Sequence, residues 1–362
     1  MTPRLKSARN LAGAFISAAL AMLAAPTVGL AQERVAGCVM DAETPPPVEA
    51  RSITVTFYGV STLMFDDGES RLLIDGFFSR PETLAGRLWS KPALVADRMA
   101  GALPVSAVLF AHAHHDHAMD LEAVAQAAPE AVIVGTPAVG LLAASRHVAP
   151  ERICAPTSPG PNAMRYGRYR VTAFDTPHGD SPFYIRWFID HEPKAAPGDG
   201  DRFWSFKDGK NRSYLIENGS TKILVHPSAS PAQLGGLGAQ VVFMGIGRLG
   251  SMPDKAFGPV LTSVLGDKPA TVIPIHWDSF ARSLEKPLVN TPWPGDKVPL
   301  GFERLCAYTG PKGWPVRRME ALSAVRITPT GEVEPVTGTI RDGCDPATWP
   351  KKQKGPRKKK GK

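Results

Sequence analysis

Four histidines and one aspartate stand within six positions directly after a strand-like segment, and this cluster constrains the fold more than any other feature. Residues 105–110 are mostly apolar, and the next residues, His112-Ala113-His114-His115-Asp116-His117, hold four of the chain's nine histidines. Side chains alternate along an extended strand, so His112 and His114 point to the same side. Asp116 and His117 follow at the turn into a helix-like segment. The cluster predicts a metal site at a strand end, and its imidazoles and carboxylate suit Zn²⁺ or Fe²⁺, with Mn²⁺ as a further candidate.

The pattern along the chain predicts an α/β (α+β) protein. Alternating, β-branched residues predict an antiparallel start of three strands, 53–58, 61–65 and 71–75, the last two joined by Asp66-Asp67-Gly68, a hairpin signal. Residues 105–145 then predict a strand, a helix, a strand and a helix. Later strands are predicted at 168–174, 183–189, 213–217, 222–225, 240–244 and 270–275, with a helix around 254–265. No composition break divides the body, so residues 32–350 are predicted to form one domain of two mixed sheets flanked by helices.

The motif gives the sequence a resemblance to a known family. His112, His114, Asp116 and His117 match H-x-H-x-D-H, the signature of the metallo-β-lactamase superfamily, and the sequence resembles that superfamily over most of the body. The resemblance implies a four-layer αββα sandwich, two mixed sheets covered by helices. It also implies single histidine ligands at two later strand ends. His178 in Asp-Thr-Pro-His and His276 in Pro-Ile-His-Trp-Asp stand at such positions.

Two further elements narrow the resemblance to one branch. The Pro-Ile-His-Trp segment is similar to the branch that holds ascorbate-phosphate lactonase-like and N-acyl-phosphatidylethanolamine phospholipase-like enzymes. The early Ile74-Asp75 pair resembles an Ile-Asp element of that branch, which implies that Asp75 orients a ligand histidine from behind. The implied ligand groups are His112, His114 and His178 on one side and Asp116, His117 and His276 on the other. Zinc, as one or two ions, is the implied cofactor, with iron or manganese as alternatives.

One departure from the family pattern concerns the second metal. Dinuclear members carry a bridging aspartate at the end of the strand between the last two histidines, but here that strand ends Val225-His226-Pro227-Ser228. Ser228 stands roughly where the bridging acid would fall, and a neutral hydroxyl is a poor partner for two cations. Two alternatives follow: His226 substitutes as an unusual ligand, or the second site is weak or empty. In a third alternative, His226 has no part in metal binding and is a strand-end residue that faces solvent or a backbone carbonyl.

Other residues near the motif are predicted to serve the reaction or the substrate. Asp116 is expected to orient a water molecule or take its proton, in addition to acting as a ligand. The alternation argument turns His115 away from its neighbours, so we expect it behind the ligands or facing the substrate. Phe203, Trp204 and Phe206 lie on a long polar loop, residues 190–212, and predict an apolar wall over the site.

Charge and cysteines bear on location. Residues 351–362 carry eight Lys or Arg and residues 1–31 three, which leaves 31 bases against 34 acids in the body, so a basic nucleic-acid-binding domain is not expected. Residues 1–31 resemble a cleaved signal peptide and predict a periplasmic or secreted protein; lipidation at Cys38 is the weaker alternative. The four cysteines then allow two disulfides, with a Cys38–Cys344 pair as a guess. The basic tail is expected to be a solvated extension or to contact an anionic envelope surface.

These observations together predict an exported metal-dependent hydrolase of a small-molecule ester, lactone, amide or phosphodiester. The missing bridging acid keeps an alternative open, a mononuclear or non-catalytic binding protein on the same fold. A di-iron redox enzyme and a true β-lactam hydrolase are further alternatives within the same superfamily.

Overall fold

The strands that carry the predicted site belong to two large mixed sheets. A computed structural model describes residues 38, 49–157, 161–292 and 294–349. These residues belong to one compact unit, and the proposed signal peptide (1–31) and basic tail (351–362) lie outside the described part of the chain. None of the described helices is long and apolar enough to cross a bilayer.

The first sheet begins antiparallel and turns parallel, as the sequence predicts for 53–75 and 105–134. Its neighbouring strands are antiparallel from β15 through β3 and parallel from β3 to β6. In spatial order the strands are β15 (Val333–Thr337), β14 (Ser323–Ile327), β1 (Ile53–Phe57), β2 (Leu63–Asp66), β3 (Arg71–Ile74), β4 (Val105–Leu109), β5 (Val132–Val134) and β6 (Ile153–Cys154).

The second sheet has six strands and the same mixture of directions. Its strands β10, β11 and β12 run parallel, and β7, β8 and β9 pair antiparallel. The spatial order is β12 (Thr271–Ile275), β11 (Val241–Gly245), β10 (Thr221–His226), β9 (Asn211–Asn218), β8 (Tyr169–Thr176) and β7 (Asn162–Tyr166). A small third sheet pairs β13 (Arg317–Met319) with β16 (Ile340–Asp342).

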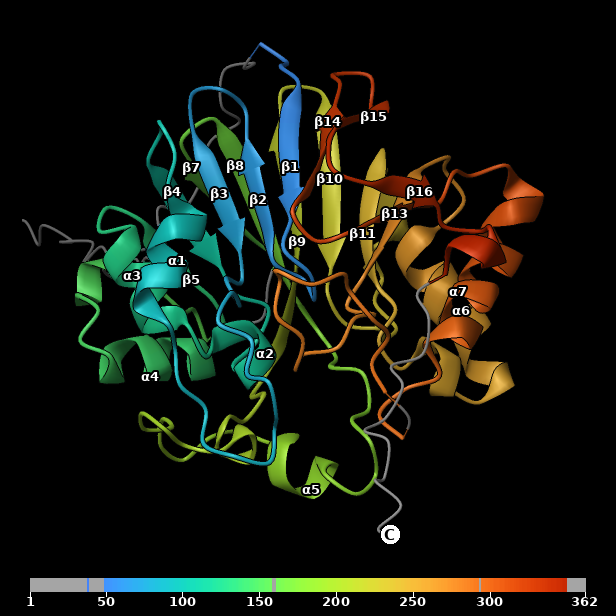
Figure 1. The fold of residues 1–362 in the computed structure, drawn as a ribbon. Coiled ribbons are helices and arrows are strands. Elements are labelled where there is room, and N and C mark those ends of the chain that lie inside the picture. The colour runs from blue at the N-terminus through green and yellow to red at the C-terminus, as the bar shows by residue number, and fades with distance from the viewer. Residues whose placement is uncertain (1–37, 39–48, 158–160, 293, 350–362) are drawn as a thin grey trace, which may run out of the picture. The chain divides into compact units, whose positions relative to one another are not determined.

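Helices cover the outer face of each large sheet, which confirms the predicted αββα sandwich. Figure 1 shows α1 (Pro92–Met99), α3 (Leu121–Ala127) and α4 (Pro137–Ser145) on the side of the first sheet, and α6 (Asp254–Leu265) and α7 (Val298–Thr309) on the side of the second. The core lies between the sheets, where Phe65 of β2 meets Phe243 of β11 with ring centroids 6.0 Å apart. Apolar side chains on both inner faces hold the two sheets together.

The predicted helix at 254–265 is confirmed, but the predicted strand at 183–189 is wrong. The carbonyl of Pro182 accepts hydrogen bonds from the amides of Ile185 and Arg186, so the chain turns there and continues into the one-turn helix α5 (Arg186–Ile189). The apolar run in this segment, which suggested a buried strand, is largely exposed. The elements from α7 to β16 are not among the predicted ones, because their apolar positions are interrupted by proline and by charged residues.

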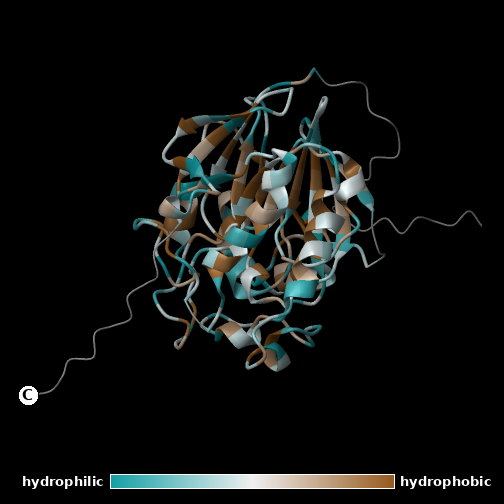
Figure 2. Ribbon diagram, turned by 90° about the vertical axis from the view of Figure 1, so that its right-hand side faces the viewer, coloured by the Kyte–Doolittle hydropathy of each residue, from teal (hydrophilic) through white to brown (hydrophobic). Residues whose placement is uncertain are grey.

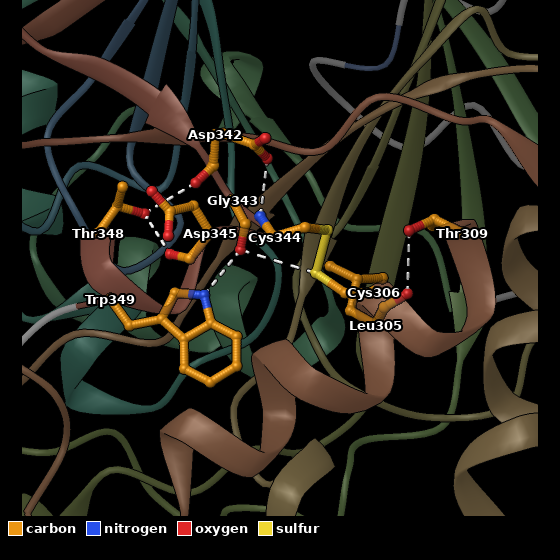
Figure 3. Close-up of a disulfide and its surroundings, with 9 residues drawn as sticks. All are labelled: Leu305, Cys306, Thr309, Asp342, Gly343, Cys344, Asp345, Thr348 and Trp349. Atoms are coloured by element: carbon orange, nitrogen blue, oxygen red, sulfur yellow. Dashed lines mark hydrogen bonds between the residues drawn. A yellow bond between two sulfur atoms is a disulfide. The ribbon is translucent and has the colours of Figure 1, made fainter. Parts of the chain in front are cut away.

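The four cysteines form two disulfides, as predicted, but the guessed pairing of Cys38 with Cys344 is wrong. The structure joins Cys38 to Cys154 and Cys306 to Cys344. Figure 3 shows that the second bridge ties α7 to the turn after β16, where the Gly343 carbonyl accepts from the Trp349 indole at 2.9 Å. The bridge is therefore a local clasp on the outer helix.

Candidate metal centre

The six predicted ligands come from strand ends that meet at one edge of the sandwich. His112 and His114 follow β4, and Asp116 and His117 lie in the one-turn helix α2 (His115–Ala118) directly after them. His178 follows the end of β8, and His276 follows the end of β12. Figure 1 places α2 at the edge to which these strands point. The fold therefore brings together side chains from four separate segments of the chain.

The ligand atoms gather in the two predicted groups. His112, His114 and His178 form one group, and Asp116, His117 and His276 form the other, with the potential ligand atoms of each group within 4.8 Å of one another. His112 and His114 are almost fully buried, and so are Asp116 and His117. Buried imidazoles and a carboxylate that converge in this way have the chemistry of a zinc or iron donor set.

The hydrogen bonds behind the first group fix its tautomers. The outer nitrogen of His112, Nδ1, lies 3.0 Å from the side-chain amide oxygen of Asn211. The amide nitrogen of the same Asn211 side chain donates to the Thr176 hydroxyl, which fixes the orientation of the amide. The outer nitrogen of His114, Nε2, lies 3.3 Å from the Ile189 carbonyl. Both oxygens only accept, so both outer nitrogens carry the proton. The inner atoms, His112 Nε2 and His114 Nδ1, are then two lone pairs that face each other at 3.0 Å.

Burial also keeps this group uncharged. Burial, reinforced by the neighbouring imidazoles, lowers the pKa of His112 and of His114 well below the usual value and lowers the pKa of His178 to about 3. The imidazoles thus hold no extra proton that could bridge the facing lone pairs. Facing lone pairs in a buried site repel each other unless a cation lies between them. The donor set therefore fits a bound divalent cation.

The second group is oriented by Asp75, as the sequence predicts. Asp75 Oδ2 accepts from His117 Nδ1 at 2.8 Å and from the Ser61 hydroxyl at 2.5 Å, and Oδ1 accepts from the Ala111 amide at 2.8 Å. With the His117 proton held on Nδ1, the lone pair of Nε2 faces His276 Nε2 at 3.2 Å. This is the carboxylate–histidine arrangement that supports ligand histidines in metal sites.

Asp116 supplies the one carboxylate of the two groups. Its Oδ2 lies 3.3 Å from His276 Nε2 and 3.6 Å from His117 Nε2. Burial alone would raise the pKa of Asp116, but the nearby His117 and His115 outweigh burial and hold it well below its usual value. Burial alone would lower the pKa of His117, but the carboxylates of Asp75 and Asp116 outweigh it and raise the pKa. Asp116 is therefore ionised in the fold.

An ion pair that the sequence analysis does not single out holds the loop of His276. His276 has a φ of +59°, and its amide donates to the Val60 carbonyl at 2.6 Å, where Val60 has a φ of +50°. Asp278 accepts from the Val60 amide at 2.7 Å and from Arg80 at 2.6 Å, and the Arg80 and Asp278 side chains are fully buried. The pair stabilises two strained residues, one of which is a predicted ligand. Asp278 stands in the Pro-Ile-His-Trp-Asp segment, which was the only available signal.

Comparison with known protein families links the histidine motif to one superfamily. The family model described as the metallo-beta-lactamase superfamily matches residues 55–151, which include β1 through α4 and the whole histidine motif. The part of the chain from β1 through α4 is therefore similar to the metallo-beta-lactamase superfamily. No curated protein matches the chain significantly.

Solved structures resemble this chain at low sequence identity. Igni18, a metallo hydrolase from Ignicoccus hospitalis, is 14% identical, covers 76% of this chain and 98% of its own, and gives a TM-score of 0.49. The metallo-beta-lactamase fold protein YhfI from Bacillus subtilis is 13% identical over 76% of this chain and 99% of its own, with a TM-score of 0.43. CmlA, a diiron beta-hydroxylase from Streptomyces venezuelae, is 11% identical over 79% of this chain and 55% of its own, with a TM-score of 0.43.

His226, the possible substitute for the bridging aspartate of this superfamily, lies outside both ligand groups. Its ring is fully buried, with Nδ1 2.7 Å from the Ser213 hydroxyl and Nε2 3.0 Å from the Ser230 carbonyl. Burial lowers its pKa to about 4. Both ring nitrogens therefore have protein partners, and the structure leaves His226 no free lone pair for a metal. The ring contacts a backbone carbonyl, as expected for a histidine with no part in metal binding, but it does not face solvent.

A pocket of about 380 Å³ opens onto both ligand groups. His114, Asp116, His178 and His276 line its floor, and its walls are mostly apolar. Ser228 also lines it, with its hydroxyl accepting from the Gly179 amide at 2.7 Å. Arg248 is the only lysine or arginine among the described residues that line the pocket. The pocket suits a substrate that places an apolar group beside the ligands.

The three aromatic residues of the long loop 190–212 behave differently from one another. Phe203 lines the pocket as expected and Phe206 is buried, and both rings contact His115, at 5.8 and 6.5 Å between ring centroids. Trp204, which the sequence also predicts as part of this wall, is 38% exposed and is not among the residues that line the pocket. Its ring instead lies against the Arg202 guanidinium, 4.9 Å away. His115 lies in the pocket wall, and its Nε2 has no hydrogen-bond partner.

Two further acids that the sequence analysis does not single out lie behind His114. Asp190 and Asp208 place carboxylate oxygens within 4.8 Å of a His114 ring nitrogen and of each other. Each has one buried oxygen without a hydrogen-bond partner. Burial and the neighbouring Asp190 raise the pKa of Asp208 to about 7. The acids flank a loop whose ends meet only in the fold, so no spacing in the sequence marks them as a pair.

Proposed function

We propose that this protein is a metal-dependent hydrolase of the metallo-beta-lactamase superfamily. The observation that carries the proposal is the convergence of imidazole nitrogens and one carboxylate in two groups at the floor of one pocket. His112, His114 and His178 would hold one cation, and Asp116, His117 and His276 would hold another. Zinc is the cation we favour, because imidazole nitrogen and one carboxylate are its usual donors in hydrolytic sites.

The chain's own residues would each have a defined part in the reaction. When bound, a divalent cation supplies Lewis acidity, which makes water more acidic and stabilises charge on an attacked carbonyl or phosphoryl oxygen. Asp116, ionised and at the pocket floor, can orient the attacking water and take its proton. Asp75 and Asn211 hold His117 and His112 in the tautomers that keep their inner lone pairs free. The apolar walls exclude bulk water from this floor.

The pocket supports a substrate with an apolar part and a hydrolysable ester, lactone, amide or phosphodiester bond. Phe203, Phe280 and Ile185 are among the apolar residues that line it. Arg248 adds one cation to the wall, with its Nη1 held by the Gly295 carbonyl at 2.6 Å. An anionic group on the substrate would find a fixed partner there.

Export is part of the proposal. Two disulfides in a chain of this size support an oxidising compartment, and the basic and apolar N-terminal residues support a signal peptide. We therefore propose a periplasmic or secreted enzyme. Mass determination of the N-terminus of the mature protein would test this, and cleavage before Gln32 is the expected result. An intact N-terminus in protein from the cell interior would contradict it.

Elemental analysis and turnover together test the hydrolase. Protein purified without chelator or affinity histidines should contain one or two equivalents of zinc and should hydrolyse bis-p-nitrophenyl phosphate, a p-nitrophenyl ester or a lactone. Chelation and His114→Ala should abolish that turnover. The matched variant His147→Ala should keep it, because His147 follows α4 and belongs to neither ligand group. Full turnover in the chelated protein would refute the proposal.

The second candidate, a mononuclear or non-catalytic binding protein, is favoured by a specific observation. Ser228 and His226 supply no carboxylate to the two ligand groups, so Asp116 is the only acid in these groups among the described residues. One equivalent of metal with turnover would support a mononuclear hydrolase. One equivalent without turnover would support the binding protein, and two equivalents of iron with a visible spectrum would instead support a redox enzyme.

Adjacent aromatic residues test the position of the substrate. Phe203 lines the pocket and Trp204 does not, so Phe203→Ala should raise KM for apolar esters by roughly three- to tenfold, the effect of losing part of an apolar contact. Trp204→Ala is the matched control and should leave KM within about twofold. Equal effects of both substitutions would place the substrate outside the pocket.

A further inference from the structure

Exposed aromatic side chains concentrate on one loop of the molecule. Nine large apolar residues are exposed in the described part of the chain, and four of them lie within six positions: Phe183 (79% exposed), Tyr184 (44%), Trp187 (80%) and Phe188 (58%). We call residues 182–189 the aromatic loop. Scattered single apolar residues on a surface are ordinary, whereas a contiguous apolar patch marks a site of interaction.

The charge of the aromatic loop is also unusual. Between Ser181 and Ile189 the sequence holds no acidic residue and one base, Arg186, which is exposed. Trp, Tyr and Phe with a basic residue are the composition that favours the interface between lipid head groups and acyl chains. The aromatic loop itself therefore carries one positive charge, while the exposed Asp180 and the partly buried Asp190 flank it.

The fold holds the aromatic loop in this exposed position. The Pro182 carbonyl accepts from the amides of Ile185 and Arg186, and the Ser181 amide donates to the Asp190 carboxylate at 3.2 Å. At the far end Ile189 is buried, and its carbonyl accepts from the Asp208 amide at 3.0 Å. Lys207 donates to the carbonyl of Phe188. The aromatic rings are thus displayed outward by a loop that is hydrogen-bonded on its inner side.

The same loop borders the candidate active site. Pro182, Tyr184 and Ile185 line the pocket, while Phe183, Trp187 and Phe188 do not. Figure 1 shows α5 beyond α2, at the edge where the ligand-bearing strands end. Figure 2 shows hydrophobic colour on the short helix at the lower end of that view. The outward aromatic rings therefore lie beside the pocket wall.

We propose that the aromatic loop docks this protein on an anionic phospholipid bilayer, with Phe183, Trp187 and Phe188 inserted at the interface and Arg186 among the head groups. Eight basic residues in the sequence 351–362 add long-range attraction to the same surface. A second copy of the chain is a poorer partner, because a two-fold contact across this loop would bring Arg186 towards its own copy with no acid of the loop to pair it. The docking does not depend on the proposed hydrolase activity.

Vesicle sedimentation of the full mature chain tests the proposal. We expect binding to vesicles of phosphatidylcholine with about a third phosphatidylglycerol, and weaker binding to phosphatidylcholine alone. The variant Phe183→Ser/Trp187→Ser/Phe188→Ser should lose about tenfold or more in vesicle partitioning. The matched control Leu141→Ser/Val336→Ser removes exposed apolar side chains from α4 and β15 and should bind like the natural chain.

A second readout separates docking from the tail and from catalysis. Brominated lipid should quench tryptophan fluorescence on binding, and Trp187→Phe should remove most of that quenching. Turnover of a water-soluble substrate without vesicles should be unchanged in the triple variant, so failure of the hydrolase proposal would leave the docking result readable. Equal vesicle binding by the triple variant and the natural chain would overturn the proposal and assign binding to the tail. Conversion of a dimer to a monomer by the triple variant, without vesicle binding by the natural chain, would overturn it in favour of a second copy.

Discussion

Replacement of Asp75 by asparagine should weaken the metal group that contains His117. The Asp75 carboxylate accepts three hydrogen bonds, from His117, Ser61 and the Ala111 amide, and all three of these partners act as donors. An asparagine side chain has one accepting oxygen and one donating nitrogen. In either orientation of the amide, its NH₂ group faces a donor: Ala111 on one side, or Ser61 and His117 on the other. If it faces His117, the ring must move its proton to Nε2, the atom that would bind the cation.

The size of the effect follows from this geometry. Loss of a carboxylate behind a ligand histidine typically weakens metal binding about 10- to 100-fold, which corresponds to about 1.4–2.8 kcal/mol. A buried donor left without an acceptor costs a further ~1–3 kcal/mol of folding free energy. Asp75→Asn should therefore lose affinity for one of two equivalents of metal and unfold at a lower urea concentration.

Competition with a colorimetric zinc chelator measures the affinity of each equivalent, and urea unfolding of the metal-free protein measures stability. Asp120→Asn is the matched control, because Asp120 is an equally buried carboxylate that accepts from Ser79, Ser90 and Phe78 and contacts none of the ligands. Asp120→Asn should lose stability and keep both metal affinities. Metal affinities of Asp75→Asn within about twofold of the natural chain would refute the reasoning about the His117 tautomer.

Three further changes test other parts of the structure. In the chelator-treated protein, burial and the neighbouring Asp190 raise the pKa of Asp208 to about 7, so its ionisation destabilises the fold as pH rises from about 4 to about 7. Asp208→Asn should add roughly 1–2 kcal/mol to urea stability at pH 8 and little at pH 4, and an equal gain at both would contradict the assignment. Cys306→Ser/Cys344→Ser opens a bridge across 38 positions and should cost about 4 kcal/mol in urea unfolding, with no change in metal content; loss of metal would show that α7 supports the centre. Ser228→Asp adds a carboxylate at the pocket and should tighten the second equivalent of zinc about tenfold or more in chelator competition; unchanged binding would place Ser228 outside reach of the cations.

The sequence predicts the ligand groups because each ligand stands at a strand end with its own local pattern. Alternation and apolar runs mark β4, β8 and β12 as strands that end just before His112, His178 and His276. These strands lie in two different sheets, so the meeting of their ends was implied by the family resemblance and not by the local patterns. Asp75 followed from a short resemblance and the end of β3. Short spacing determines only the motif from His112 to His117, and the division into two groups was implied by the resemblance.

Other features depend on contacts that local patterns do not encode. His226 ends β10 like a ligand, but Ser213 of the neighbouring strand and the Ser230 carbonyl take both its nitrogens. The run 183–189 has the composition of a strand, and only its exposure shows otherwise. Four cysteines allow three pairings, and no local feature of the sequence favours one pairing over the others. Asp190 and Asp208 meet only when the long loop closes on itself.

The charges of the two ligand groups bear on how the centre works. Three neutral imidazoles form the first group, and the second contains two imidazoles and one carboxylate, Asp116. Two divalent cations would bring four positive charges, while the protein supplies one negative charge in direct reach, because Ser228 is neutral. In a buried site such an excess is costly until an anion approaches. The balance therefore favours either a single resident cation or a substrate that brings negative charge to the pocket floor, and Arg248 in the pocket wall is placed to favour the same kind of substrate.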